Sequence, residues 1–181
     1  MLAGLGDGSG RRGRAVARRW WLWVGAAAVV LGLTVWLVWP SPPEAPRARP
    51  YLDYTACLLT DAQGVAGAAA RPVWAGMEDA SLATHARVQY LAVAGEPTVA
   101  NALPYLNSLL QRRCAVVVAV GAAQVAAVNA DAAKYPGVRF VAVGGPPAGG
   151  NVIVLNGLSD VQLRDRTRGI LVDAVRAASQ K

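Results

Sequence analysis

The chain has 181 residues, a formal net charge of +7 and a hydrophobic content of 54%. The charge is unevenly placed, because eleven Lys or Arg residues and nine Asp or Glu residues follow Pro50. A nearly neutral domain gives no electrostatic reason to expect nucleic-acid binding, which needs a basic surface. The excess of basic residues lies instead in the amino-terminal arm and linker, where it sets membrane topology and can touch anionic lipid.

Residues 20–39 carry no charge and have the length that an α-helix needs to cross about 30 Å of hydrocarbon. Tryptophans mark both ends, where indole rings favour the headgroup layers. Five arginines and one acid precede the stretch, so the positive-inside rule makes residues 1–19 a basic cytoplasmic arm. We predict a single-pass protein of the cell membrane with an extracellular carboxyl-terminal domain, in preference to a cleaved signal or a buried soluble helix.

Residues 40–50, PSPPEAPRARP, are rich in proline and are expected to form a semi-rigid, extended linker. The linker separates the predicted anchor from residues 51–181. A segment of that length is large enough for one domain with its own hydrophobic core.

Short apolar runs alternate with stretches of helical spacing in the domain. Strands are expected at 55–60, 88–93, 114–120, 139–143 and 151–155, and helices at 71–83, 101–113, 122–134 and from 159 towards 179. Asn101 is expected to cap the second helix, so that Pro104 falls in its first turn. Gly169 is the expected weak point of the last helix. The alternation predicts an α/β fold, a single Rossmann-like lobe. Its parallel five-stranded sheet should have the order 2-1-3-4-5, with helices on both faces.

Ligands of such sheets bind beyond the carboxyl ends of the strands, where the strand order reverses. This edge should contain six candidate ligand-binding residues: Asp61, Gln63, Gly64, Gly121, Ala122 and Gly144. Glycine there lets a backbone approach a ligand closely, and a helix that begins near Ala122 would direct free N–H groups at it. The alternative is that these glycines only end strands.

Four segments carry a resemblance to a known family: LLTDAQGV, PVWAGMEDA, CAVVVAVGAAQVAAVNADAAKYPGVRFVAVGG and GNVIVL. Together they resemble the amino-terminal lobe of the basic membrane protein (BMP) family, which are substrate-binding proteins of ABC transporters with the type 1 periplasmic-binding-protein fold. The similarity covers roughly residues 54–175. Characterised members of the family bind purine nucleosides between two lobes, which implies a nucleoside-like ligand here. One lobe is present in this chain.

The sequence departs from the family at the positions that hold the ligand. The family follows its first aspartate and glycine with an acidic pair, a serine, an aromatic residue and an asparagine, whereas residues 65–71 here read VAGAAAR. Gly144 also stands where the family has an aspartate. The resemblance therefore implies weak binding, or a site completed by a second lobe or a transporter or regulatory partner. The alternative is a non-catalytic interaction module that keeps the fold and has lost the site.

No catalytic motif is found, and we predict that the protein is not an enzyme and needs no cofactor. The single histidine, His85, is isolated, and the two cysteines lack the spacing of a metal site. Cys57 does not lie in a lipidation box. Aligned strand ends would place Cys57 and Cys114 about three residues, or roughly 10 Å, apart, so two buried thiols are favoured over a disulfide, which remains the alternative.

Overall fold

A computed structural model describes residues 51–146 and 149–180. Its sheet has five parallel strands in the order β2-β1-β3-β4-β5, which confirms the predicted α/β fold and strand order. The strands are β1 (Thr55–Thr60), β2 (Arg87–Ala92), β3 (Val116–Val120), β4 (Arg139–Val143) and β5 (Val152–Leu155). All five residues of β3 are buried, as expected for a central strand covered on both faces.

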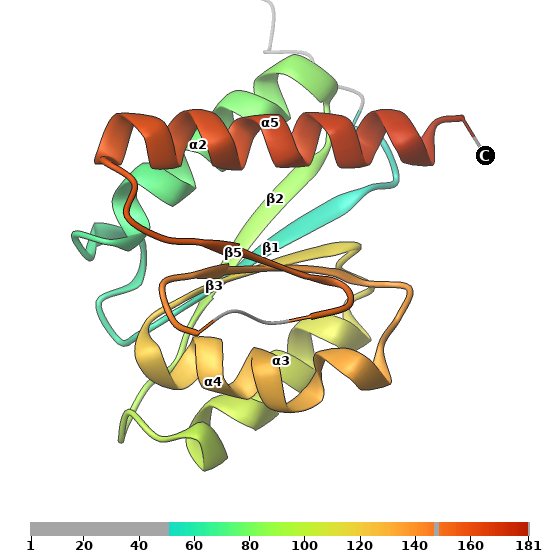
Figure 1. Ribbon diagram of the computed structural model, residues 1–181. Coiled ribbons are helices and arrows are strands. Elements are labelled where there is room, and N and C mark those ends of the chain that lie inside the picture. The colour runs from blue at the N-terminus through green and yellow to red at the C-terminus, as the bar shows by residue number, and fades with distance from the viewer. Residues whose placement is uncertain (1–50, 147–148, 181) are drawn as a thin grey trace, which may run out of the picture. The chain divides into compact units, whose positions relative to one another are not determined.

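Helices cover both faces of the sheet (Figure 1). They are α2 (Ala70–Thr84), α3 (Val99–Gln111), α4 (Ala122–Asp131) and α5 (Asp160–Ala178), with the short 3-10 helices η1 (Gly64–Ala66) and η2 (Ala132–Lys134). Helices α2 and α5 cover one face around Met77 and Leu171, whereas α3 and α4 cover the other around Leu106 and Phe140. Each face of the sheet thus has its own hydrophobic core.

The predicted membrane anchor cannot be compared with this structure, because residues 20–39 lie outside the described residues. The same holds for the arm at 1–19 and the linker at 40–50. Within residues 51–146 and 149–180, no helix is both long and apolar enough to cross a bilayer. The anchor and the domain boundaries stay predictions.

Helix α3 begins earlier than the sequence predicts. Its N-cap is Thr98, whose Oγ1 accepts a hydrogen bond from the Asn101 backbone N–H at 3.2 Å. Asn101, the predicted cap, instead donates from Nδ2 to the carbonyls of Ala94 (2.7 Å) and Glu96 (2.9 Å), so it holds the loop that follows β2. The predicted start was wrong because Thr98 and Asn101, which lie three positions apart, are both good capping residues, and the helix begins at the first of them. Pro104 consequently lies inside the helix.

Helix α5 is one continuous helix. The Ser159 hydroxyl accepts from the Gln162 backbone N–H, and the Gln162 side chain accepts from the Ser159 N–H, which is a complete capping box. Gly169 does not break the helix. Its neighbours Ile170 and Leu171 are buried against the sheet, and this packing outweighs the cost of about 1 kcal/mol for glycine in a helix.

A disulfide joins Cys57 in β1 to Cys114, with their Cα atoms 5.8 Å apart. The expectation of two thiols was wrong because Cys114 does not continue β3, which begins at Val116. The chain leaves α3 through a Schellman motif: the Cys114 N–H donates to the Leu109 carbonyl, and Arg113 is left-handed at φ 58°. Cys114 therefore lies on the α3 side of the sheet and approaches Cys57 from that face.

Candidate functional site

The carboxyl edge of the sheet brings three predicted residues into one row. Leu59 pairs with Ala119, and Val120 pairs with Val143. Because the strands are parallel, the same register places Asp61 beside Gly121, and Gly121 beside Gly144. A Cβ atom on Gly121 would lie 3.9 Å from the Asp61 Cβ. Ala122, the exposed first residue of α4, follows directly.

The loop after β1 turns away from this row. The Asp61 Oδ1 accepts from the Gln63 N–H at 3.0 Å, and the Asp61 carbonyl accepts from the Gly64 N–H at 3.1 Å. Such an Asx turn reverses the chain within three residues. Gln63 stays exposed, whereas Gly64 is buried next to Tyr90 of β2. The structure therefore gathers Asp61, Gly121, Ala122 and Gly144 and places Gly64 towards the outer strand β2.

Gln124 is the residue of this site that the sequence analysis missed. It is 2% exposed, and its Nε2 donates to the Thr60 carbonyl at the end of β1, at 3.3 Å. The same side chain lies against Gly121, where a Cβ would overlap the Gln124 Oε1. Gly121, at φ 109°, is needed both for its backbone angle and for this close approach. Gln124 thus links the start of α4 to the end of β1 beneath the candidate row.

One signal in the sequence could have identified Gln124. Gly121 is the N-cap of α4, so Gln124 occupies the third helical position, where a glutamine commonly folds back towards the cap. The cap residue here is Gly121, which has no side chain to form the second bond of a capping box. The Gln124 side chain bonds instead to Thr60 of β1.

The electrostatics of the row favour an uncharged ligand. The amino end of α4 directs backbone N–H groups and a positive dipole end towards the edge. The exposed Asp61 carboxylate stands next to it and offsets that attraction for an incoming anion. A molecule that donates a hydrogen bond to Asp61 and accepts one from the helix end matches both groups.

Four hollows of about 420, 460, 540 and 570 Å³ lie elsewhere on the domain. None of these four is lined by a predicted site residue. One lies between β5 and α5, and another lies at the amino ends of β1 and β2.

An ion pair joins the two helices on one face of the sheet. Arg164 of α5 donates to both carboxylate oxygens of Asp79 in α2, at 2.6 and 3.0 Å. These hydrogen bonds lower the pKa of Asp79 and raise the pKa of Arg164. The pair holds helices together and lies on the helical layer, away from the strand ends.

Comparisons with known proteins define the fold and leave the family open. No protein-family model matches the chain, and no curated protein matches it. A solved structure named "putative lipoprotein from Peptoclostridium difficile 630 (fragment)" is similar, with a TM-score of 0.53 and 14% sequence identity. The similarity covers 71% of this chain and 100% of that chain. At this identity the likeness supports a shared fold, and the resemblance to the BMP family stays a prediction.

Proposed function

We propose that the chain is a membrane-anchored, extracytoplasmic protein of the solute-binding type, similar to the BMP substrate-binding components of ABC transporters. Its carboxyl edge binds an uncharged, nucleoside-like molecule weakly. The observation that carries this proposal is the row of Asp61, Gly121 and Gly144 at the point where the strand order reverses. In open α/β sheets this is where ligands bind.

The disulfide supports the extracytoplasmic location. Cys57 and Cys114 are 0% and 1% exposed, so the bridge is part of the core. Structural disulfides persist in oxidising compartments and are rare in the cytosol. This agrees with the topology that the arginines before residue 20 predict.

The row is suited to binding rather than to a reaction. Asp61 can accept a hydrogen bond from a hydroxyl or ring N–H, and Gly121 and Gly144 let a flat ligand approach the backbone. A nucleophile would need a base within hydrogen-bond reach, and the row contributes one carboxylate and backbone groups. Affinity stays low until a second lobe buries the other face of the ligand.

A thermal-shift titration of residues 51–181 with purine nucleosides tests this proposal. A ligand at 100 times its dissociation constant should add about 2.7 kcal/mol to the free energy of unfolding. Asp61→Asn should abolish the shift, whereas Asp173→Asn, which removes an exposed acid from α5, should keep it. Equal shifts in both variants, or none in the wild type at millimolar nucleoside, would reject nucleoside binding at this edge.

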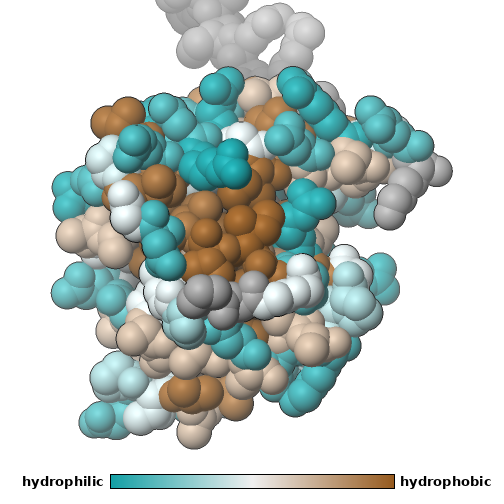
Figure 2. Space-filling model, viewed as in Figure 1, coloured by the Kyte–Doolittle hydropathy of each residue, from teal (hydrophilic) through white to brown (hydrophobic). Residues whose placement is uncertain are grey.

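A second candidate function is a non-catalytic interaction module. Figure 2 shows apolar side chains gathered over β5, the outer strand of the sheet. The hollow of about 540 Å³ at this place is lined by Ile153, Leu155 and Leu158 together with polar residues of α5. An unpaired strand edge next to apolar surface is a common docking surface for another chain.

Site-specific photo-crosslinking in intact cells distinguishes this candidate. A photoreactive residue at Leu158, which is 38% exposed beside β5, should capture a second lobe or a transporter or regulatory protein. The same group at Leu82, 57% exposed on α2, is the matched control. Equal capture from both positions would argue against a specific β5 interface.

A further inference from the structure

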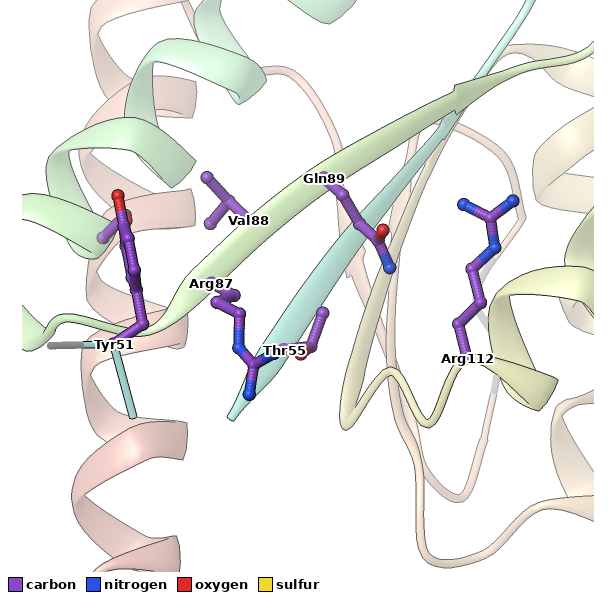
Figure 3. A pocket seen from close by; sticks show the side chains of 7 residues that line it. Tyr51, Thr55, Arg87, Val88, Gln89 and Arg112 are labelled. Atoms are coloured by element: carbon purple, nitrogen blue, oxygen red, sulfur yellow. The ribbon is translucent and has the colours of Figure 1, made fainter. Parts of the chain in front are cut away.

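A hollow of about 460 Å³ lies at the amino edge of the sheet, opposite the edge discussed so far. It is lined by Tyr51, Thr55, Ser81, Arg87, Gln89 and Arg112, and by Val88. Figure 3 shows Arg112 projecting on the same side of β2 as the Gln89 amide, whereas Tyr51 and Val88 lie on the other side. Arg87 and Arg112 thus contribute two guanidinium groups to the lining of this hollow.

The amino edge is positively charged around this hollow. Arg87 begins β2, Arg112 and Arg113 follow α3, and Arg139 begins β4. Asp53 pairs with Arg87 at 2.7 Å, but its side chain is fully exposed and Arg87 is about half exposed. An exposed pair of this kind is weak and can be exchanged for another anion. Within the described residues, no ion pair is found for Arg112.

The walls of the hollow are fixed by the disulfide. Cys57 lies two residues after Thr55 in β1, and Cys114 lies two residues after Arg112. The Gln89 Nε2 contacts both sulfurs, at 3.2 Å to Cys57 and 3.6 Å to Cys114. The covalent bridge therefore ties the strand that carries Thr55 to the turn that carries Arg112. A preformed site loses less conformational entropy when it binds a ligand.

Paired guanidinium groups are suited to bind phosphate, either as free phosphate or as part of a lipid headgroup. The position of the hollow along the chain favours the lipid. Tyr51 lines the hollow, and Tyr51 and Leu52 are 53% and 44% exposed. The predicted linker, residues 40–50, spans at most about 3.6 Å per residue. If residues 20–39 cross the bilayer, this tether keeps the amino edge within roughly 40 Å of the lipid surface. Exposed tyrosine and leucine beside arginine are suited to that interface.

We infer that this hollow binds the phosphate headgroup of an anionic phospholipid through Arg87 and Arg112. The planar guanidinium fork matches two phosphate oxygens at once. The hydroxyl of Thr55 lies in the same lining and can donate a further hydrogen bond. The inference rests on the anchor in the proposed function and not on ligand binding at that edge.

Hydrogen exchange on the full chain in nanodiscs tests the inference. Discs of phosphatidylcholine are compared with discs that also contain phosphatidylglycerol, and exchange is followed in peptides covering residues 85–90 and 110–115. Phosphatidylglycerol should slow exchange in both peptides. Arg112→Gln should raise the fraction of phosphatidylglycerol needed for half of this effect by about fivefold, the contribution of one arginine near an anionic surface. Arg87→Gln should act in the same direction.

Two further variants sharpen the result. Arg166→Gln removes an exposed arginine near β5 and should leave the lipid response unchanged. Asp53→Asn removes the competing carboxylate and should lower the fraction of phosphatidylglycerol required. No response to phosphatidylglycerol, or an equal response in Arg112→Gln and Arg166→Gln, would overturn the inference. Slowing by inorganic phosphate in pure phosphatidylcholine discs would also overturn it, by assigning the hollow to free phosphate. This experiment contains no nucleoside. A negative result would therefore reject lipid binding at the amino edge without bearing on nucleoside binding at the carboxyl edge.

Discussion

The Gln124 side chain links α4 to the end of β1 by donating to the Thr60 carbonyl at 3.3 Å. A buried amide in this position stabilises the domain and occupies space at the reversal of strand order. The candidate site is therefore an exposed edge, and none of the four hollows described above includes it. This relationship explains why one lobe alone is expected to hold a ligand weakly.

Gln124→Ala should separate these two effects. Loss of the buried hydrogen bond should lower the free energy of unfolding by about 1 kcal/mol, measured by urea denaturation. The space left by the smaller side chain should increase the thermal shift that a purine nucleoside produces. A variant with reduced stability and an unchanged ligand response would show that Gln124 does not limit binding.

The contact between α2 and α5 depends on Gly76. A Cβ at this position would overlap the Arg164 backbone carbonyl oxygen and lie 3.1 Å from the Thr167 Cβ. Because backbone cannot move aside cheaply, Gly76→Ala should cost about 1–3 kcal/mol of stability in a urea melt. The helices would have to separate.

Gly169→Ala is the matched control for Gly76→Ala. Gly169 lies in α5, and a Cβ there meets no atom within 4 Å. Alanine should therefore stabilise the domain by about 0.5–1 kcal/mol through helix propensity. If both alanine variants were destabilised equally, close packing of α2 on α5 would not be the cause.

The disulfide closes a loop with a sequence separation of 57. In the chain-entropy description, a loop of this size contributes about 4 kcal/mol. The double variant Cys57→Ala, Cys114→Ala should therefore unfold at much lower urea, and reduction of the wild type should shift its midpoint in the same direction. An unchanged urea midpoint in oxidised and reduced protein would contradict the bridge.

The ion pair between Asp79 and Arg164 predicts a specific pH dependence. The hydrogen bonds from Arg164 lower the pKa of Asp79 in the folded state, with Arg168 adding a smaller effect in the same direction. A lowered pKa means that the stabilisation is complete above the ordinary aspartate pKa of about 3.9 and is lost as the pH falls through the folded value. The Tm difference between wild type and Asp79→Asn should be constant near neutrality and vanish in acid. A difference that grows in acid would contradict this sign.

The sequence predicts the sheet well because strand burial leaves a direct pattern. The apolar run at 114–120 indicated a covered strand, which the structure has at 116–120, and β1 has the bounds that its apolar run and Asp61 indicate. Strand order followed from right-handed crossovers. The candidate residues followed from where the strands end, and the register of the structure places Asp61, Gly121 and Gly144 in one row.

Features that depend on side-chain reach or on chain direction were missed. The position of Gln124 near the start of its helix is visible in the sequence, but its partner, a strand residue 64 positions earlier, is not. Cys114 was placed in a strand because it precedes valines, whereas the left-handed Arg113 turns the chain onto the α3 face. Arginine adopts this conformation rarely, so composition gave no warning.

Mapping of ligand-induced shifts of backbone amides by NMR on residues 51–181 tests the central claim most directly. With a purine nucleoside added, the account predicts concentration-dependent shifts confined to Gly121, Ala122, Gly144 and the Asp61 turn. Shifts confined to β5 or to the amino edge, or an unchanged spectrum at saturating nucleoside, would contradict a solute site at the carboxyl edge.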